Sequence, residues 1–196
     1  MLAQVGARSN VMEDTTVDQI RAWHSEHMQF KRLLDFLERQ MVEFHAGRHP
    51  NYELMRDVVH YLHHFADRIH HPREDVAFAL LEKRDPEFQL YLNQLLQQHR
   101  VIAVAGEALL KHLEDILQDA IIERPTMEAA AALYLVYFRH HLASEENKAL
   151  PHAAKVLTQE DWTAVAAAVS DIPDPLFGGD VAARYRELYE QITREA

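Results

Sequence analysis

The sequence of 196 residues has no cysteine, only 5 glycines and 7 prolines, and no long uninterrupted hydrophobic run. The absence of cysteine excludes disulfides, thiolate metal sites and thiol catalysis. The scarcity of glycine and proline, beside abundant Leu, Ala, Glu and Gln, favours helix throughout. Because no apolar run is long enough to span a membrane and residues 1–10 lack the hydrophobic stretch of a signal peptide, we expect a cytoplasmic protein with no membrane partner.

The net charge and the histidine content limit the possible partners and ligands further. The formal net charge is −11, which would repel phosphate groups, so we expect no nucleic-acid partner. The 14 histidines are the unusual part of the composition, and they are scattered along the chain rather than gathered in a tag. The length suits a single domain that buries roughly 70% of its unfolded surface.

Apolar residues recur with a helical period in four long stretches. In the first stretch Ile20, His27, Leu34 and Met41 repeat every seven residues, so His27 takes a place that Leu or Ile would normally fill. The predicted helices cover residues 17–46, 51–81, 85–118 and 126–157. Since the breaks between them are short, we predict an all-α, up-down-up-down four-helix bundle.

The two ends of the chain differ from this pattern. Residues 1–15 have no periodic apolar pattern, and we expect a mobile N-terminal tail there, followed by one domain over residues 16–196. Thr158 and Asp161 form a weaker version of the capping box, which predicts a short helix after the bundle. Residues 181–193 predict a second short helix. Within the second long helix, Pro72 removes a hydrogen bond and predicts a kink.

Histidines and glutamates stand at mirrored positions about the helix breaks. The midpoints between successive groups fall at residues 49–50, 85–86 and 120–121, which lie at or a few residues before the three breaks. His-x-x-x-Glu spacing places both side chains on one face of a helix. Antiparallel helices would therefore bring six side chains to one height: His27, His70, Glu74, His99, His141 and Glu145.

The chemistry of this set indicates a metal site. Two buried glutamates without a cation or hydrogen-bond partner would be very costly, and the nitrogen and oxygen ligands suit iron, manganese or zinc. The alternative is a purely structural role, in which these are hydrogen-bonded histidines of the core. The Glu-x-x-His pair of ferritin-like bundles and the His-Glu-x-x-His motif of zinc proteases are both absent.

Other polar residues near the set have lesser roles in this interpretation. His24, one turn before His27, is a candidate additional ligand, and His63 is a candidate proton relay. Two histidines adjoin ligand positions and are expected to point elsewhere: His71 and His140. Two acids are read as outer-face charges that could hydrogen-bond a neighbouring helix: Asp75 and Glu146.

The motifs His70-His71-Pro72-Arg73-Glu74-Asp75 and His141-Leu142-Ala143-Ser144-Glu145-Glu146, with Leu150-Pro151 and the segment at 174–178, resemble the hemerythrin-like HHE cation-binding family. The resemblance covers roughly residues 17–190. It implies two non-haem iron ions, for which Mn or Zn could substitute, bridged by the two glutamates and capped by the histidines. Oxygen-carrying members have a fifth histidine where this chain has Ala103. The set of four His and two Glu is similar instead to bacterial relatives in nitrosative stress and iron–sulfur repair.

The resemblance implies three functions. The first is a protein that binds or senses O2, NO or peroxide in oxidative or nitrosative stress. The second is a donor of labile iron for cluster repair. The third is a di-iron oxidase or peroxidase, which ranks last because no general acid outside the ligand set is evident. Homo-oligomerisation stays open.

Overall fold

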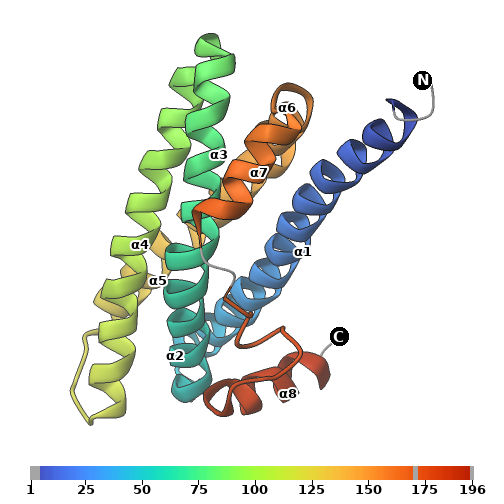
Figure 1. The fold of residues 1–196 in the computed structure, drawn as a ribbon. Coiled ribbons are helices and arrows are strands. Elements are labelled where there is room, and N and C mark those ends of the chain that lie inside the picture. Colours follow the sequence, from blue (N-terminus) through green and yellow to red (C-terminus); the bar gives the residue numbers. More distant parts are fainter. Residues whose placement is uncertain (1–4, 170–171, 195–196) are drawn as a thin grey trace.

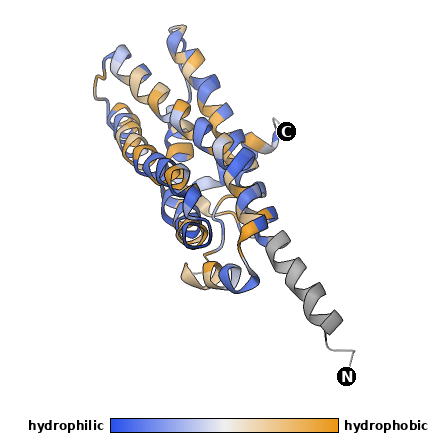
Figure 2. Cartoon of the chain, turned by 90° about the horizontal axis from the view of Figure 1, so that it is seen from above, coloured by the Kyte–Doolittle hydropathy of each residue, from blue (hydrophilic) through white to orange (hydrophobic). Residues whose placement is uncertain are grey.

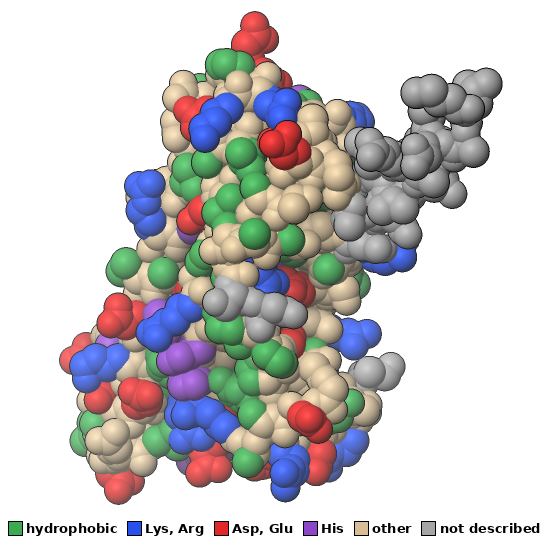
Figure 3. Space-filling model, in the orientation of Figure 1, with side chains coloured by type: hydrophobic (Ala, Val, Ile, Leu, Met, Phe, Trp, Pro, Cys, Tyr) green, Lys and Arg blue, Asp and Glu red, His purple; other side chains and the backbone are tan. Residues whose placement is uncertain are grey.

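The computed structural model describes residues 5–169 and 172–194, with side chains from residue 19 onward (Figure 1). Within this part of the chain every regular element is a helix and there is no strand, which confirms the all-α class. None of the described helices is both long and apolar enough to cross a membrane. On the face drawn in Figure 3, acidic and basic side chains are interspersed among apolar ones.

The chain forms four long helical segments and reverses direction between them (Figure 1). The first is α1 (Val5–His45). The second combines α2 (Tyr52–Tyr61), the π-helical η1 (Leu62–His70) and α3 (His71–Arg84). After the 3-10 turn η2 (Pro86–Phe88), the third is α4 (Gln89–Leu117). The fourth combines α5 (Arg124–Ser144), the π-helical η3 (Glu145–Ala149) and α6 (Leu150–Val156).

These segments pack side by side. Helix α4 contacts α5 and α2, and α1 contacts α5 and α2, so the segments enclose a common interior. Seen from above, the helices carry both hydrophobic and hydrophilic residues, as amphipathic helices do (Figure 2). The three breaks lie where the sequence predicts them. At the first break Gly47 adopts a positive φ of 73°, which a residue without Cβ tolerates.

Local signals account for several helix ends. The side chain of Asn51 caps α2 by accepting a hydrogen bond from the backbone N–H of Leu54. Thr158 and Asp161 form both halves of a capping box at the start of α7 (Gln159–Ala168), as the sequence predicts. The last elements are η4 (Ala183–Tyr185) and α8 (Arg186–Arg194). The two expected short helices after the bundle are therefore present.

Helix α1 begins earlier than the apolar pattern indicates. It starts at Val5, whereas the pattern starts at Val17, and in Figure 1 this end of α1 extends beyond the neighbouring helices. A helix that is already nucleated can extend without an apolar stripe, because each added residue gains one hydrogen bond. Residues 1–4 of the expected tail lie outside the described residues, and the mobility of the tail stays a prediction.

Two prolines coincide with π-helical turns. Pro72 is the second residue of α3, directly after η1, and Pro151 is the second residue of α6, directly after η3. Proline lacks an N–H donor and clashes with the carbonyl one turn earlier, and a wider i→i+5 turn accommodates this. The disturbance expected at Pro72 is therefore a π segment. Pro151, inside the predicted helix of residues 126–157, carries the same signal, which the sequence analysis did not use.

The core consists of two apolar clusters separated by a polar layer. The larger cluster contains Phe30, Phe65, Ile102 and Phe138. The smaller cluster contains Trp23, Phe78, Leu95 and Ala149. On each long segment the histidines and glutamates of interest lie between residues of the two clusters. This places a polar layer in a water-excluding interior.

Candidate metal centre

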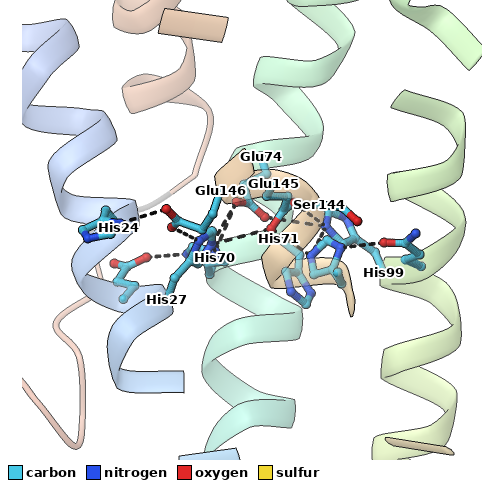
Figure 4. A network of polar contacts seen from close by, with 12 residues as sticks. His24, His27, His70, His71, Glu74, His99, Ser144, Glu145 and Glu146 are labelled. Atoms are coloured by element: carbon cyan, nitrogen blue, oxygen red, sulfur yellow. Dashed lines mark hydrogen bonds and ion pairs between the residues drawn. The ribbon is translucent and has the colours of Figure 1, made fainter. Parts of the chain in front are cut away.

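The structure brings together all six side chains that the spacing singled out. His27 lies on α1, His70 ends η1, Glu74 lies on α3, His99 lies on α4, His141 lies on α5, and Glu145 begins η3. All are buried, and His99, the most exposed of them, has only 7% of its surface accessible. Figure 4 labels five of them, which converge between the helices: His27, His70, Glu74, His99 and Glu145.

The histidines form two close pairs through their inner nitrogens. The Nε2 atoms of His27 and His70 are 2.8 Å apart. The Nε2 atoms of His99 and His141 are 3.1 Å apart. Each pair joins two different helices, so each presents two nitrogen donors to one position.

Glu74 lies between the two pairs. Its Oε1 atom is 3.4 Å from His27 Nε2 and 3.2 Å from His70 Nε2. Its Oε2 atom is 3.6 Å from His99 Nε2. One carboxylate therefore directs its two oxygens toward two separate donor pairs, which is the arrangement needed to bridge two ions.

Glu145 also lies between the two pairs, but both of its oxygens face the pair of His99 and His141, and Oε2 faces His27 as well. Its Oε2 atom is 3.1 Å from His141 Nε2 and 3.6 Å from His27 Nε2, and its Oε1 atom is 3.5 Å from His99 Nε2. None of the four oxygens of Glu74 and Glu145 has a hydrogen-bond partner of normal geometry. Buried carboxylate oxygens without such partners are costly, and a cation between the donor pairs would satisfy them. The donor set therefore fits a metal centre.

The outer nitrogens of the histidines are held by oxygen acceptors. His27 donates from Nδ1 to Glu146 Oε1 at 2.6 Å, and His99 donates from Nδ1 to Asp75 Oδ1 at 2.7 Å. An acceptor at Nδ1 fixes the proton of a neutral imidazole there and leaves the Nε2 lone pair directed inward. Metal-binding histidines show this kind of support.

The other two histidines are supported in the same way. His141 Nδ1 lies 3.2 Å from Gln98 Oε1, and His70 Nδ1 bonds to Glu26. The sequence reading missed Glu26 and Gln98, and it treated Asp75 and Glu146 as outer-face charges that could reach a neighbouring helix. The signal that could have found all four is adjacency, because each acceptor directly precedes or follows a residue of the set.

The four acceptors form a closed ring around the interior. A residue next to an inward-facing ligand is rotated by about 100° and therefore faces a neighbouring helix. Each segment thus supports the histidine of another: Glu26 of α1 supports His70, Asp75 of α3 supports His99, Gln98 of α4 supports His141, and Glu146 of η3 supports His27.

Charges in the layer change the pKa values of its members. Burial opposes protonation of His27, but the carboxylates of Glu146 and Glu74 outweigh it and raise the pKa of His27 to about 10. Burial and the charge of Glu74 both oppose ionisation of Glu145, yet the facing imidazoles of His141 and His99 lower its pKa to about 2. Protonated histidines thus compensate the glutamates in the metal-free protein, and a metal ion would displace those protons.

The geometry tests the expectations about three neighbouring histidines. His71, expected to point elsewhere, is buried and its ring stacks on that of His99, with centroids 4.2 Å apart, so the expectation was wrong. The wider π turn before it reduces the angle between successive side chains. His24 is 57% exposed and bonds through Nδ1 to Glu146 Oε2, outside the set. His140 is exposed, as expected.

Comparison with known families agrees with the site. The sequence matches the hemerythrin HHE cation binding domain over residues 18–153, a range that includes all six side chains. No curated protein and no solved structure gives a significant match. The matched range covers more than half of the chain, and the chain therefore belongs to the hemerythrin HHE cation-binding family.

Proposed function

We propose that the chain is an up-down-up-down four-helix bundle that holds two non-haem iron ions and binds, or reacts with, a small diatomic ligand, O2 or NO. Members of the family bind metal ions, typically iron, and hemerythrin-like domains bind small ligands such as O2. Bound iron would supply redox chemistry and a position for the diatomic ligand. Manganese or zinc could occupy the same donors.

The observation that supports two ions is the placement of the glutamates between two histidine pairs. His27, His70 and Glu74 offer donor atoms that all lie within 4.8 Å of one another, and a second such group, built around His99 and His141, also contains Glu74. A single tetrahedral ion would use four donors. Two groups that share a carboxylate instead suit two bridged ions.

The surroundings of the layer suit a small apolar ligand. Aromatic side chains of both core clusters lie on either side of the layer, among them Trp23, Phe30 and Phe78, and they exclude bulk water. A surface cavity of about 440 Å³ lies at the edge of the site, beside Glu146. Its lining is mostly apolar and comprises Ile20, Arg21, His24, Glu146, Leu150, Pro151 and Ala154. An apolar cavity at this place offers a diatomic gas an approach to the edge of the layer.

Metal stoichiometry tests the di-iron proposal. Protein loaded anaerobically with ferrous iron should bind two ions per chain, and Glu74→Ala or Glu145→Ala should lower this number because each removes a bridging carboxylate. Glu107→Ala is the matched control, since Glu107 is an exposed glutamate on α4. A stoichiometry near one that neither substitution changes would contradict the proposal.

The ligand is tested separately by absorption spectroscopy. Addition of O2 or NO to the anaerobic ferrous protein should change the spectrum, with saturation at one ligand molecule per two iron ions. The Glu74→Ala variant should lose this response, whereas Glu107→Ala should keep it. A fully loaded protein whose spectrum responds to neither gas, and which loses iron rapidly to a chelator after reduction, would favour iron donation instead.

A further inference from the structure

His71 is the one buried histidine of the layer for which the six-residue set has no role. Only 2% of its surface is accessible, and neither ring nitrogen has a hydrogen-bond partner of normal geometry. Burying an imidazole without partners costs free energy, so the position calls for an explanation. His140, which also adjoins a member of the set, is exposed and raises no such question.

The contacts of His71 direct it to one of the two histidine pairs. Its ring stacks on His99 and meets the ring of His141 edge-on, with centroids 5.1 Å apart. One donor atom from each of His71, Glu74, His99 and His141 lies within 4.8 Å of the others. The second group of donors, around His27 and His70, does not include it.

The outer nitrogen of His71 faces a side-chain oxygen, as in the other four histidines. His71 Nδ1 is 3.3 Å from Oδ1 of Asp67, whose side chain is only 4% exposed. The other oxygen of Asp67 is held by His63 Nδ1 at 3.0 Å. Asp67 is therefore fixed in place, and with Nδ1 directed toward it, Nε2 is the nitrogen that remains for the interior.

We infer that His71, once its ring turns out of the stack on His99, is a fifth histidine ligand at the metal position formed by His99 and His141. This inference rests on the proposed metal-binding function. It divides the histidines into three at one position and two at the other, and it assigns the third ligand to α3 instead of to the turn of α4 that contains Ala103. The π segment η1 makes this division available, because it brings the adjacent residues His70 and His71 to the same interior.

The rival explanation is that His71 only packs against His99. The substitution His71→Phe separates the two, because it keeps an aromatic ring at this place and removes both nitrogens. His140→Phe is the matched control, since it changes an exposed histidine that also adjoins a member of the set. Co²⁺ is the probe, because the intensity of its visible absorption depends on coordination number and its affinity can be measured by competition with a chelator.

We expect H71F to lower the binding affinity for one of the two Co²⁺ ions by about tenfold or more and to change the visible absorption of that ion. The affinity for the other ion should not change. H140F should behave as the unmodified protein does. Adding Ala103→His to H71F should restore the affinity for the more weakly bound ion, since position 103 lies one turn after His99. If H71F does not fold, His71→Gln, which keeps a hydrogen-bonding group near Asp67, serves in the same comparison.

Unchanged affinity and spectrum in H71F would overturn the inference. An equal loss of affinity for both ions that Ala103→His does not restore would overturn it too. The test also distinguishes the inference from the function on which it rests. If the unmodified protein binds a single Co²⁺, the di-iron proposal fails, and the effect of H71F on that one ion still decides the role of His71.

Discussion

The metal-free protein should lose stability as the pH rises above neutrality, because protonated histidines compensate its buried glutamates. Burial opposes the charge on His27, but Glu146 and Glu74 raise the pKa of His27 from 6.5 to about 10. A group whose pKa is raised on folding contributes stability that is complete below its unfolded pKa. This contribution is lost as the pH rises through the folded pKa. The window for His27 therefore runs from about pH 6.5 to about pH 10.

The size of this effect follows from the difference between the two pKa values of His27. Three and a half pH units, at about 1.4 kcal/mol per unit, correspond to about 5 kcal/mol. Because Glu146 and Glu74 are the partners of His27 in these interactions, their lowered pKa values add no second contribution. A loss of this size is a large part of the total stability of a typical domain, about 5–15 kcal/mol.

At acid pH the contribution of the glutamates to stability depends on pH in the opposite direction. The pKa of Glu145 falls on folding from 4.5 to about 2, so its contribution is complete above pH 4.5 and is lost as the pH falls through about 2. Burial lowers the pKa of His71 on folding from 6.5 to about 4, so its contribution is complete above pH 6.5 and is lost as the pH falls through about 4. The metal-free protein should therefore be most stable near pH 6.5.

Urea denaturation of chelator-treated protein between pH 6 and 10 measures the alkaline loss. His27→Gln should flatten the profile, whereas His45→Gln, which changes a histidine with a 79% exposed side chain, should not. Metal binding competes with protons, so the stabilisation by metal should instead grow over the same range. Metal-free stability that is constant or rises from pH 6.5 to 10 would refute the reasoning.

Three further predictions concern the site and its surroundings. Metal addition should raise the melting temperature of metal-free protein by mass action, and an equal rise after replacement of both His70 and His141 would exclude the layer as the binding site. Glu146→Gln should weaken metal binding about 10- to 100-fold, because it weakens the support of His27 Nδ1; chelator competition measures this, and an unchanged affinity would contradict it. Phe30→Ala should cost about 3–5 kcal/mol, since its fully buried ring packs on His70 with centroids 5.0 Å apart; a loss below about 1 kcal/mol in urea denaturation would show that the site tolerates a cavity there.

The helical class, the helix breaks and the six polar residues of the layer could all be predicted from the amino-acid sequence. These features depend on local spacing along the sequence. Because a helix repeats every 3.6 residues, this spacing fixes which side chains share a face. Mirror placement about the breaks was enough to bring His27, His70, His99 and His141 to one height. The family resemblance rested on the same local motifs, and the match over residues 18–153 confirms it.

The residues that surround these six could not be predicted, because they depend on how the helices pack. The ring of Glu26, Asp75, Gln98 and Glu146 depends on how neighbouring helices are rotated against one another, and the period of one helix does not contain that rotation. The inward position of His71 depends on a π turn, in which hydrogen bonds shift from i→i+4 to i→i+5. A regular α-helix, with 100° between successive residues, predicts that His71 points away from the layer. The wider π turn before Pro72 instead places His71 inside it.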